Sequence, residues 1–180
     1  MSEEVLVKPY TRYSGKVVSI GSFTYNTKFI PEGFVLVGNA IDEPTESHLI
    51  NLIDNGKAIE LKEIMKCIAK EFEGELTCKL NEYTFGKLKL GEGMAPERED
   101  NKYYNACVVV INMGSDIELT ITDTKTRKTY PIMLPRRSMF LLQDKQFKFT
   151  RSISKKDEYL IGDNTFKRDI RYSLVFKSRK

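Results

Sequence analysis

Six short apolar runs follow one another in the second half of the chain, and each ends at residues that are typical of turns. The runs are rich in β-branched and aromatic side chains, which favour strands over helices. Short strands leave unpaired edges unless they close into packed sheets. We therefore expect two antiparallel sheets packed as a jelly-roll sandwich, with strands at 107–112, 117–122, 130–134, 138–142, 147–153 and 170–176 and turns at Gly114-Ser115, Asp123-Thr124, Pro135-Arg136 and Gly162-Asp163.

Two helices are predicted in the first half of the chain, after short strands and turns at 16–36. Asp42, Glu43 and Pro44 suit a helix start, and apolar residues recur behind them at helical spacing. In the second helix the apolar residues form one stripe, and that helix is expected to end near Gly74. The expected fold class is α+β and mainly β, with the helices bracing one outer face of the sandwich. The stripe consists of Leu61, Ile64, Met65, Ile68 and Phe72.

The size and composition suit one domain with its own core. The chain has 180 residues, 41% hydrophobic and 30% charged, a balance typical of soluble globular proteins. No run approaches the roughly 20 apolar residues of a membrane span, and residues 1–10 lack the pattern of a secretion signal. Cys67, Cys78 and Cys107 have no C-x-x-C pairing, which leaves a disulfide framework and a zinc site unsupported. We expect no membrane partner and a cytoplasmic location, with the nucleus as the alternative.

Positive charge is concentrated toward the C-terminal end. Residues 1–124 carry 13 Lys or Arg against 20 Asp or Glu, and residues 125–180 carry 16 against 5, so net charges of −7 and +11 make up the total of +4. A basic block attracts polyanions, which makes RNA or a ribonucleoprotein the expected partner, with a solvated edge and a frayed tail as the alternative. Tyr159, Phe166 and Tyr172 lie among the basic residues and are candidates for stacking on bases. The expected nucleic-acid-binding residues are Arg136, Arg137, Lys155, Lys156, Lys167, Arg168, Arg179 and Lys180.

The residues for metal or nucleophilic catalysis are missing. His48 is the single histidine and lies on the first predicted helix, away from other candidate ligands, so we expect a structural role. An iron facial triad needs two histidines, and a Ser-His-Asp or Cys-His site would have to use His48 without a nucleophile elbow. The Gly91-Glu92-Gly93 run matches neither a P-loop nor a dinucleotide fingerprint and is interpreted as a turn.

Four strings in the second half have an order and spacing that chance does not explain: GEGMAPEREDNKYYNACVVVINMGS (91–115), LPRRSMFLL (134–142), FTRSI (149–153) and RYSLVFK (171–177). They resemble the core of the AlkB-like iron and 2-oxoglutarate dioxygenases. In that family a Gly-Glu-Gly turn is followed by Pro, a His-x-Asp metal pair and two aromatic residues. After these come, in order, the segments Leu-Gly-Ser, Pro-Arg-Ser, His-Gly-Ile and Arg-x-Ser-Leu-x-Phe-Arg. The resemblance implies a double-stranded β-helix, in one AlkB-like domain over 1–180, with strands and helices at 1–80 and the β-helix core at 81–180.

The resemblance fails at all three metal ligands. Where the family has His-x-Asp, this chain has Glu97-Arg98-Glu99, and where it has the distal histidine, this chain has Arg151. A guanidinium repels a divalent cation and pairs with carboxylates instead. The departures predict an ion pair between Arg151 and the glutamates, with no metal and no cofactor.

The positions that bind 2-oxoglutarate in the family match only in part. Arg171 matches the first of two basic residues that grip this cofactor, but the second, an arginine in the family, is Lys177. The family's Asn-x-Tyr contact falls on Gly86 and Leu88 without gaps, and on Asn81 and Tyr83 only with an insertion. We expect Arg171 and Lys177 to be vestigial cofactor positions. For Arg171, an ordinary basic residue on a core strand is the alternative.

Three functions are compatible with these features. The preferred one is a non-catalytic pseudo-oxygenase that binds RNA or a ribonucleoprotein, a ribosome-associated factor being one specific form. The second is an active 2-oxoglutarate dioxygenase with an atypical metal site that demethylates nucleic acid or protein. The third is a protein-interaction module whose acidic front half binds one partner and whose basic end binds another.

Overall fold

The computed structural model describes residues 17–20, 23–26, 31, 33–72, 76–143, 146–161 and 163–180. The helices in this part of the chain are α1 (Glu43–Asp54) and α2 (Ala58–Glu71), and a short 3-10 helix, η2 (Gln146–Lys148), precedes β10. The strands are β1 (Val17–Ile20), β2 (Phe23–Asn26), β3 (Phe34–Val37), β4 (Glu82–Leu88), β5 (Met94–Glu97), β6 (Tyr104–Met113), β7 (Ile117–Asp123), β8 (Thr129–Leu134), β9 (Met139–Gln143), β10 (Phe149–Ile153), β11 (Glu158–Ile161), β12 (Asn164–Lys167) and β13 (Arg171–Arg179).

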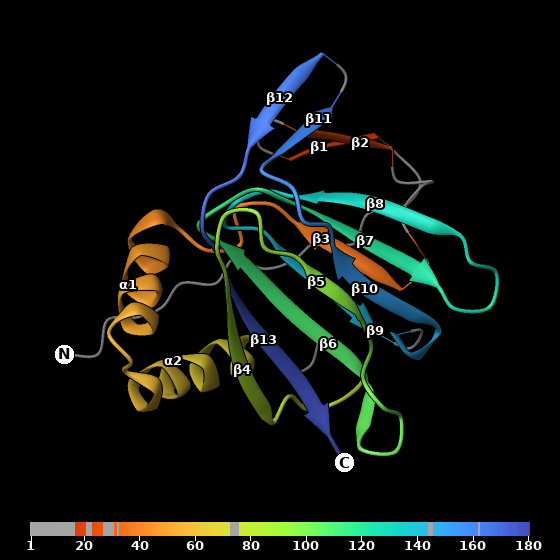
Figure 1. The fold of residues 1–180 in the computed structure, drawn as a ribbon. Helices are drawn as coiled ribbons and strands as arrows, with labels where there is room; N and C mark the ends of the chain where they lie inside the picture. The colour runs from red at the N-terminus through yellow and green to blue at the C-terminus, as the bar shows by residue number, and fades with distance from the viewer. Residues whose placement is uncertain are drawn as a thin grey trace.

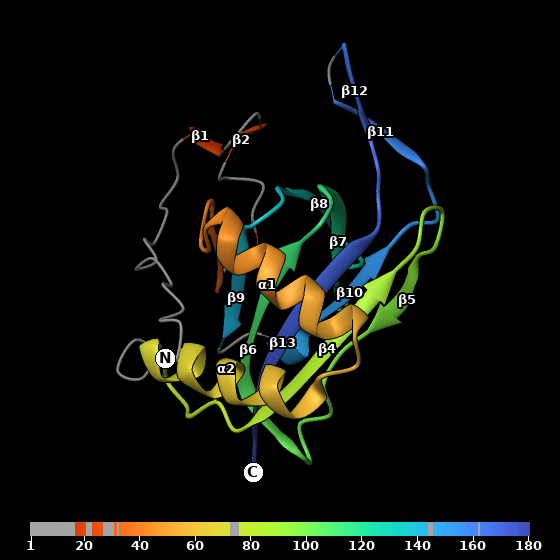
Figure 2. The same ribbon diagram turned by 90° about the vertical axis from the view of Figure 1, so that its left-hand side faces the viewer.

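Two antiparallel sheets pack against each other as a jelly-roll sandwich (Figure 1). The larger sheet has the order β3-β9-β6-β13-β4, and the smaller has the order β5-β10-β7-β8. The β1–β2 and β11–β12 hairpins belong to neither sheet, and β11–β12 projects from the body of the molecule (Figure 2). The predicted fold class, mainly β with a double-stranded β-helix, is confirmed.

The central strand β6 shows why the run before Gly114 is almost continuously apolar. Successive side chains of a strand point to opposite faces. Val108 and Val110 therefore belong to the core between the sheets, and Val109 and Ile111 to a second core on the other face of the larger sheet. Both faces of this strand are covered, so every side chain from Cys107 to Met113 is buried.

The helices cover the outer face of the larger sheet (Figure 2). At the start of α1, the Asp42 carboxylate accepts a hydrogen bond from the Thr45 backbone N–H at 2.9 Å, which caps the helix next to Pro44. In α2 the predicted stripe faces the sheet, with Leu61 and Met65 fully buried. The two predicted helices and their bracing position are confirmed. Gly74, expected near the end of α2, lies outside the described residues.

The structure corrects several strand predictions. β4, β5 and the β11–β12 hairpin were not expected, because their sequences mix exposed polar residues with few buried ones. The expected strand at 147–153 is divided into η2 and the shorter β10, and β13 continues past 176 to Arg179. Parts of the range 16–36, expected to hold short strands and turns, and Gly162, expected in a turn, lie outside the described residues. Within the described ranges, neither helix has the length and hydropathy to cross a membrane.

Candidate functional site

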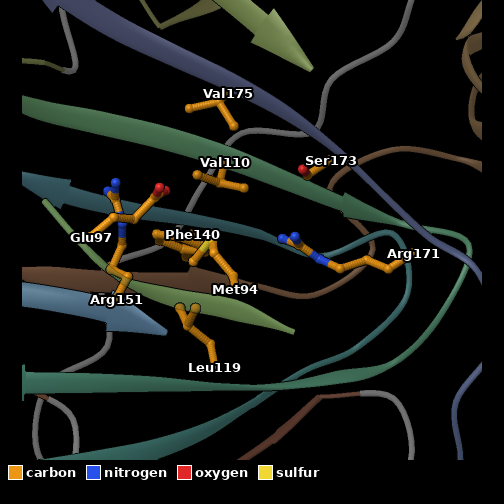
Figure 3. Close-up of a pocket in the computed structure, with 9 residues that line it drawn as sticks. All are labelled: Met94, Glu97, Val110, Leu119, Phe140, Arg151, Arg171, Ser173 and Val175. Atoms are coloured by element: carbon orange, nitrogen blue, oxygen red, sulfur yellow. The ribbon is translucent and has the colours of Figure 1, made fainter. Parts of the chain in front are cut away.

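The candidate site lies between the two sheets, where β5 and β10 face β13 (Figure 3). Arg151 of β10 is paired across the strands with Glu97 of β5, and Glu99 follows β5 by two residues. The Arg151 Nη2 atom donates a hydrogen bond to Glu99 Oε1 at 2.5 Å, and the two side chains are only 5% and 3% exposed. The predicted Glu–Arg ion pair is confirmed for Glu99. Glu97 forms no ion pair with another described residue.

Lys177 of β13 completes this charge cluster. Its Nζ atom lies 3.3 Å from the same Glu99 Oε1 atom, so one carboxylate faces two cations. Burial opposes ionisation of Glu99, but the charges of Arg151 and Lys177 and the hydrogen bond from Arg151 outweigh it and hold the Glu99 pKa below its ordinary value. Glu99 is therefore a carboxylate at neutral pH and links β5, β10 and β13 electrostatically.

A second buried arginine lies farther along the same interior. Arg171, at the start of β13, donates from Nε to the Asn112 Oδ1 atom at 2.9 Å. Burial, together with the nearby positive charges of Arg168 and Arg151, lowers the Arg171 pKa to about 10. Arg171 nevertheless stays positively charged at neutral pH.

A cavity of about 50 Å³ separates the two arginines. Figure 3 shows Arg171 at one end and Arg151 with Glu97 at the other. The walls between them are mostly apolar, so the cavity offers neither a nucleophile next to a base nor a paired acid and base. The lining residues are Met94, Glu97, Val110, Leu119, Phe140, Arg151, Arg171, Ser173 and Val175.

The residues at this site do not fit a catalytic iron. A guanidinium donates hydrogen bonds and has no lone pair with which to bind a metal. Here the Arg151 guanidinium is hydrogen-bonded to Glu99, so this carboxylate is not free to bind a metal. In the described ranges, no three His, Cys, Asp or Glu side chains come close enough to hold a metal ion together. His48 lies half-buried on α1 and does not line the cavity.

The positions expected for 2-oxoglutarate do not fit this cofactor either. Lys177 is directed to Glu99 and does not line the cavity. Gly86 and Leu88, the positions that the alignment without gaps gives, lie on β4 and are paired with Ser173 and Arg171 of β13. A Cβ atom at Gly86 would lie 3.0 Å from the Ser173 Oγ atom, so a larger side chain has little room there. The cofactor would thus lack its Asn-x-Tyr contacts and one of its two cations.

Asn81 and Tyr83, the residues of the gapped alignment, lie elsewhere. The Asn81 side chain forms hydrogen bonds with the backbone of Arg179 at the end of β13. The Tyr83 ring packs edge-on against Phe176, 6.0 Å between centroids, in the core beneath the helices. Neither residue lines the cavity.

The structural comparison agrees with this architecture. A crystal structure of a Pseudomonas putida prolyl-4-hydroxylase is similar to this chain with a TM-score of 0.53 and 9% sequence identity, over 82% of this chain and 88% of the hydroxylase chain. The chain has a dioxygenase-like fold. At this identity the similarity concerns the fold alone. No protein-family model and no curated protein sequence matches the chain.

The eight basic residues expected to bind nucleic acid do not form one surface. Five of them contact protein groups closely, and the remaining three, Lys155, Lys156 and Lys167, are exposed at the base of the β11–β12 hairpin. Of these three, Lys156 lies 4.0 Å from a Glu118 carboxylate oxygen. Tyr159 and Tyr172 are only 3% and 6% exposed, so the expectation that their rings stack on bases is wrong. The five engaged residues are Arg136 and Arg137 beside Glu46, Arg168 on the Ser154 and Lys156 carbonyls, Arg179 beside Glu82, and Lys180 on the Asn101 carbonyl.

Asn112 is the residue of this site that the sequence interpretation missed. Its Nδ2 atom donates to the carbonyl oxygens of Ser115, Leu134 and Pro135, and its Oδ1 atom accepts from Arg171. Buried side-chain amides are retained where all their hydrogen bonds are made. The one sequence signal for this role was the amide side chain of Asn112 near the end of the otherwise apolar run 107–113.

Proposed function

We propose that this chain is a non-catalytic, AlkB-like pseudo-oxygenase that acts by binding RNA or a ribonucleoprotein, the ribosome being one specific form of that partner. The observation that carries the non-catalytic part is the buried Arg151 guanidinium on Glu99, with Lys177 beside the same carboxylate. A divalent cation at this position would have to displace two positive groups from the carboxylate it needs.

The RNA part of the proposal is supported by the charge distribution. Residues 125–180 have a net charge of +11, and long-range attraction and counterion release favour polyanions near a segment with this charge. The dioxygenase-like fold supports the pseudo-oxygenase part, because it places the strands that carry Glu97 and Arg151 side by side.

Metal content and turnover test the non-catalytic part. We expect the purified protein, loaded with ferrous iron and then dialysed, to retain far less than one iron per chain and to release no succinate from 2-oxoglutarate. The comparison variant is Arg151→His, which places an imidazole beside two carboxylates. Stoichiometric iron with succinate release in the unmodified protein would instead establish an active dioxygenase.

RNA binding is tested separately, by sedimentation of the native protein in a cell extract through a ribosome gradient and by direct titration with RNA. We expect co-sedimentation with ribosomal subunits that is lost after nuclease treatment, and binding that weakens steeply as salt rises from about 50 to 200 mM. An association that survives nuclease and is insensitive to salt would identify a protein partner and contradict the RNA proposal.

A further inference from the structure

A group of exposed basic side chains lies at one end of the smaller sheet. Lys125, Arg127 and Lys128 lie on the turn between β7 and β8, which projects from the sheet in Figure 1. Lys148 of η2 and Arg98, which follows β5, are beside this turn. We call these five residues the basic end; all five are exposed, and none was expected from the sequence to bind nucleic acid.

Hydrogen bonds hold the members of the basic end together although they are distant in sequence. The Thr124 backbone N–H and hydroxyl both donate to the Lys148 carbonyl oxygen, at 2.9 and 3.0 Å. The Arg98 Nη1 atom donates to the Phe147 carbonyl oxygen at 2.9 Å. Three separate segments of the chain are therefore fixed next to one another.

The β7–β8 turn itself is rigidly built around Asp123. The carboxylate of Asp123 accepts hydrogen bonds from the Lys125 and Thr126 backbone N–H groups, each at 2.9 Å. The Asp123 carbonyl oxygen accepts from the Arg127 N–H, and Arg127 adopts a positive φ of 62°. An Asx-type turn of this kind fixes the backbone beneath three cationic side chains, so little conformational entropy of the backbone is lost when they bind a ligand.

Carboxylates of the described residues compensate little of the positive charge at the basic end. Asp123 is paired with Lys148 at 3.0 Å. None of the other four side chains forms an ion pair with a described carboxylate, and the Lys128 Nζ atom lies 4.8 Å from the centre of the Tyr130 ring. This contrasts with Arg136, Arg137 and Arg179, which face carboxylates.

We infer that the basic end is the surface through which the chain contacts the phosphate backbone of RNA. This inference rests on the proposed function and assigns its contact surface. Ammonium and guanidinium groups on a fixed turn match phosphate oxygens, whereas the neighbouring rings of Tyr130 and Phe149 pack against each other, 6.4 Å between centroids, and Phe149 is buried. The binding should therefore depend on charge and salt but not on base sequence.

A pair of matched triple variants tests this assignment. The first, Lys125→Gln/Arg127→Gln/Lys128→Gln, removes three charges from the basic end, and the second, Lys155→Gln/Lys156→Gln/Lys167→Gln, removes three exposed charges from the base of the β11–β12 hairpin. The probe is a fluorescein-labelled, mixed-sequence single-stranded RNA of about 20 nucleotides, titrated by anisotropy at several salt concentrations. Far-ultraviolet circular dichroism and thermal melting verify that both variants fold like the unmodified protein.

For the first variant we expect an affinity at about 100 mM salt at least ~10-fold weaker, and a slope of log K against log salt reduced by about 2, because each lost phosphate contact contributes about 0.7 to the slope. The second variant should bind within about threefold of the unmodified protein. Equal affinity and slope for the first variant, with RNA binding intact in the unmodified protein, would overturn the assignment of the surface alone. Absence of RNA binding by the unmodified protein would overturn the proposed function as well.

Discussion

Replacing Glu99 by Gln leaves the Arg151 guanidinium buried without its carboxylate partner. Both side chains are at most 5% exposed and are joined at 2.5 Å, so water cannot take over the role of the carboxylate. Breaking a buried ion pair from one side costs about 3 to 5 kcal/mol. Gln keeps one oxygen that can accept from Arg151, which places the expected loss of unfolding free energy near the lower limit, about 3 kcal/mol.

A double-mutant cycle with Arg151→Met separates the pair from its surroundings. Arg151→Met leaves Glu99 with Lys177 at 3.3 Å, so this single change should cost less than Glu99→Gln, about 1 to 2 kcal/mol. In the double variant neither buried charge of the pair is present, and the total cost should be smaller than the sum by about 2 kcal/mol. Urea unfolding followed by circular dichroism measures all four free energies.

The pH dependence of the cost of Glu99→Gln is an independent test of the same ion pair. Since the Glu99 pKa is below its unfolded value of 4.5, the carboxylate stabilises the folded state above that pH and loses this contribution as the pH falls through its lowered folded value. The free-energy difference between the unmodified protein and Glu99→Gln should therefore be constant near pH 7 and shrink in acid. A cost below about 1 kcal/mol for Glu99→Gln, or additive single changes, would refute the buried-pair reasoning.

Two further substitutions and one titration test other parts of the structure. Glu46→Gln alters a fully buried carboxylate that accepts the Gly114 backbone N–H at 2.8 Å, and should lower the urea unfolding free energy by about 2 kcal/mol. Gly114→Ala places a Cβ atom near the Ile170 carbonyl oxygen at a φ of 79°, and should lower the thermal midpoint by about 4 to 8 °C. The backbone N–H of Thr126 is the main cause that lowers the Asp123 pKa to about 2, so Asp123 stabilises the fold above 3.8 and this effect is lost toward pH 2. NMR titration of the Asp123 carboxyl group measures this pKa directly, and an ordinary value would contradict the turn geometry.

The parts of the fold that the sequence predicted are those in which burial repeats regularly. β7 was located within one residue of its end, because its side chains alternate between buried and half-exposed along the whole strand. β4 was not found, because it is an edge strand on which Thr84, Phe85 and Lys87 are exposed, and no alternation of apolar residues marks it. Edge strands are stabilised by pairing with a neighbour, which a local pattern does not record.

One feature of the candidate site, the ion pair of Arg151 with a glutamate, was predictable because it follows from the charge of a single buried side chain. Arg151 had to find an anion once it was buried between strands, and the glutamates near β5 were the nearest candidates in the aligned strings. The direction of Lys177 was not predictable, because it depends on which carboxylate lies across the sandwich and not on its neighbours in sequence. The prediction that the basic residues form one binding surface was wrong for the same reason. Arg136, for example, contacts Glu46, which lies 90 positions away in the sequence.

The charge cluster also explains why one substitution is not expected to restore a metal site. Arg151→His removes the guanidinium, but Glu99 keeps Lys177 at 3.3 Å, and this ammonium continues to neutralise the carboxylate that a metal would need. Glu97 stands opposite position 151 with an oxygen donor, where an imidazole would be required for a facial triad. The carboxylate follows β5, and the guanidinium and the ammonium lie on β10 and β13, so their mutual attraction links three segments of the sandwich while it excludes a divalent cation. The same interaction therefore connects these segments and occupies the carboxylate that a metal at this site would need.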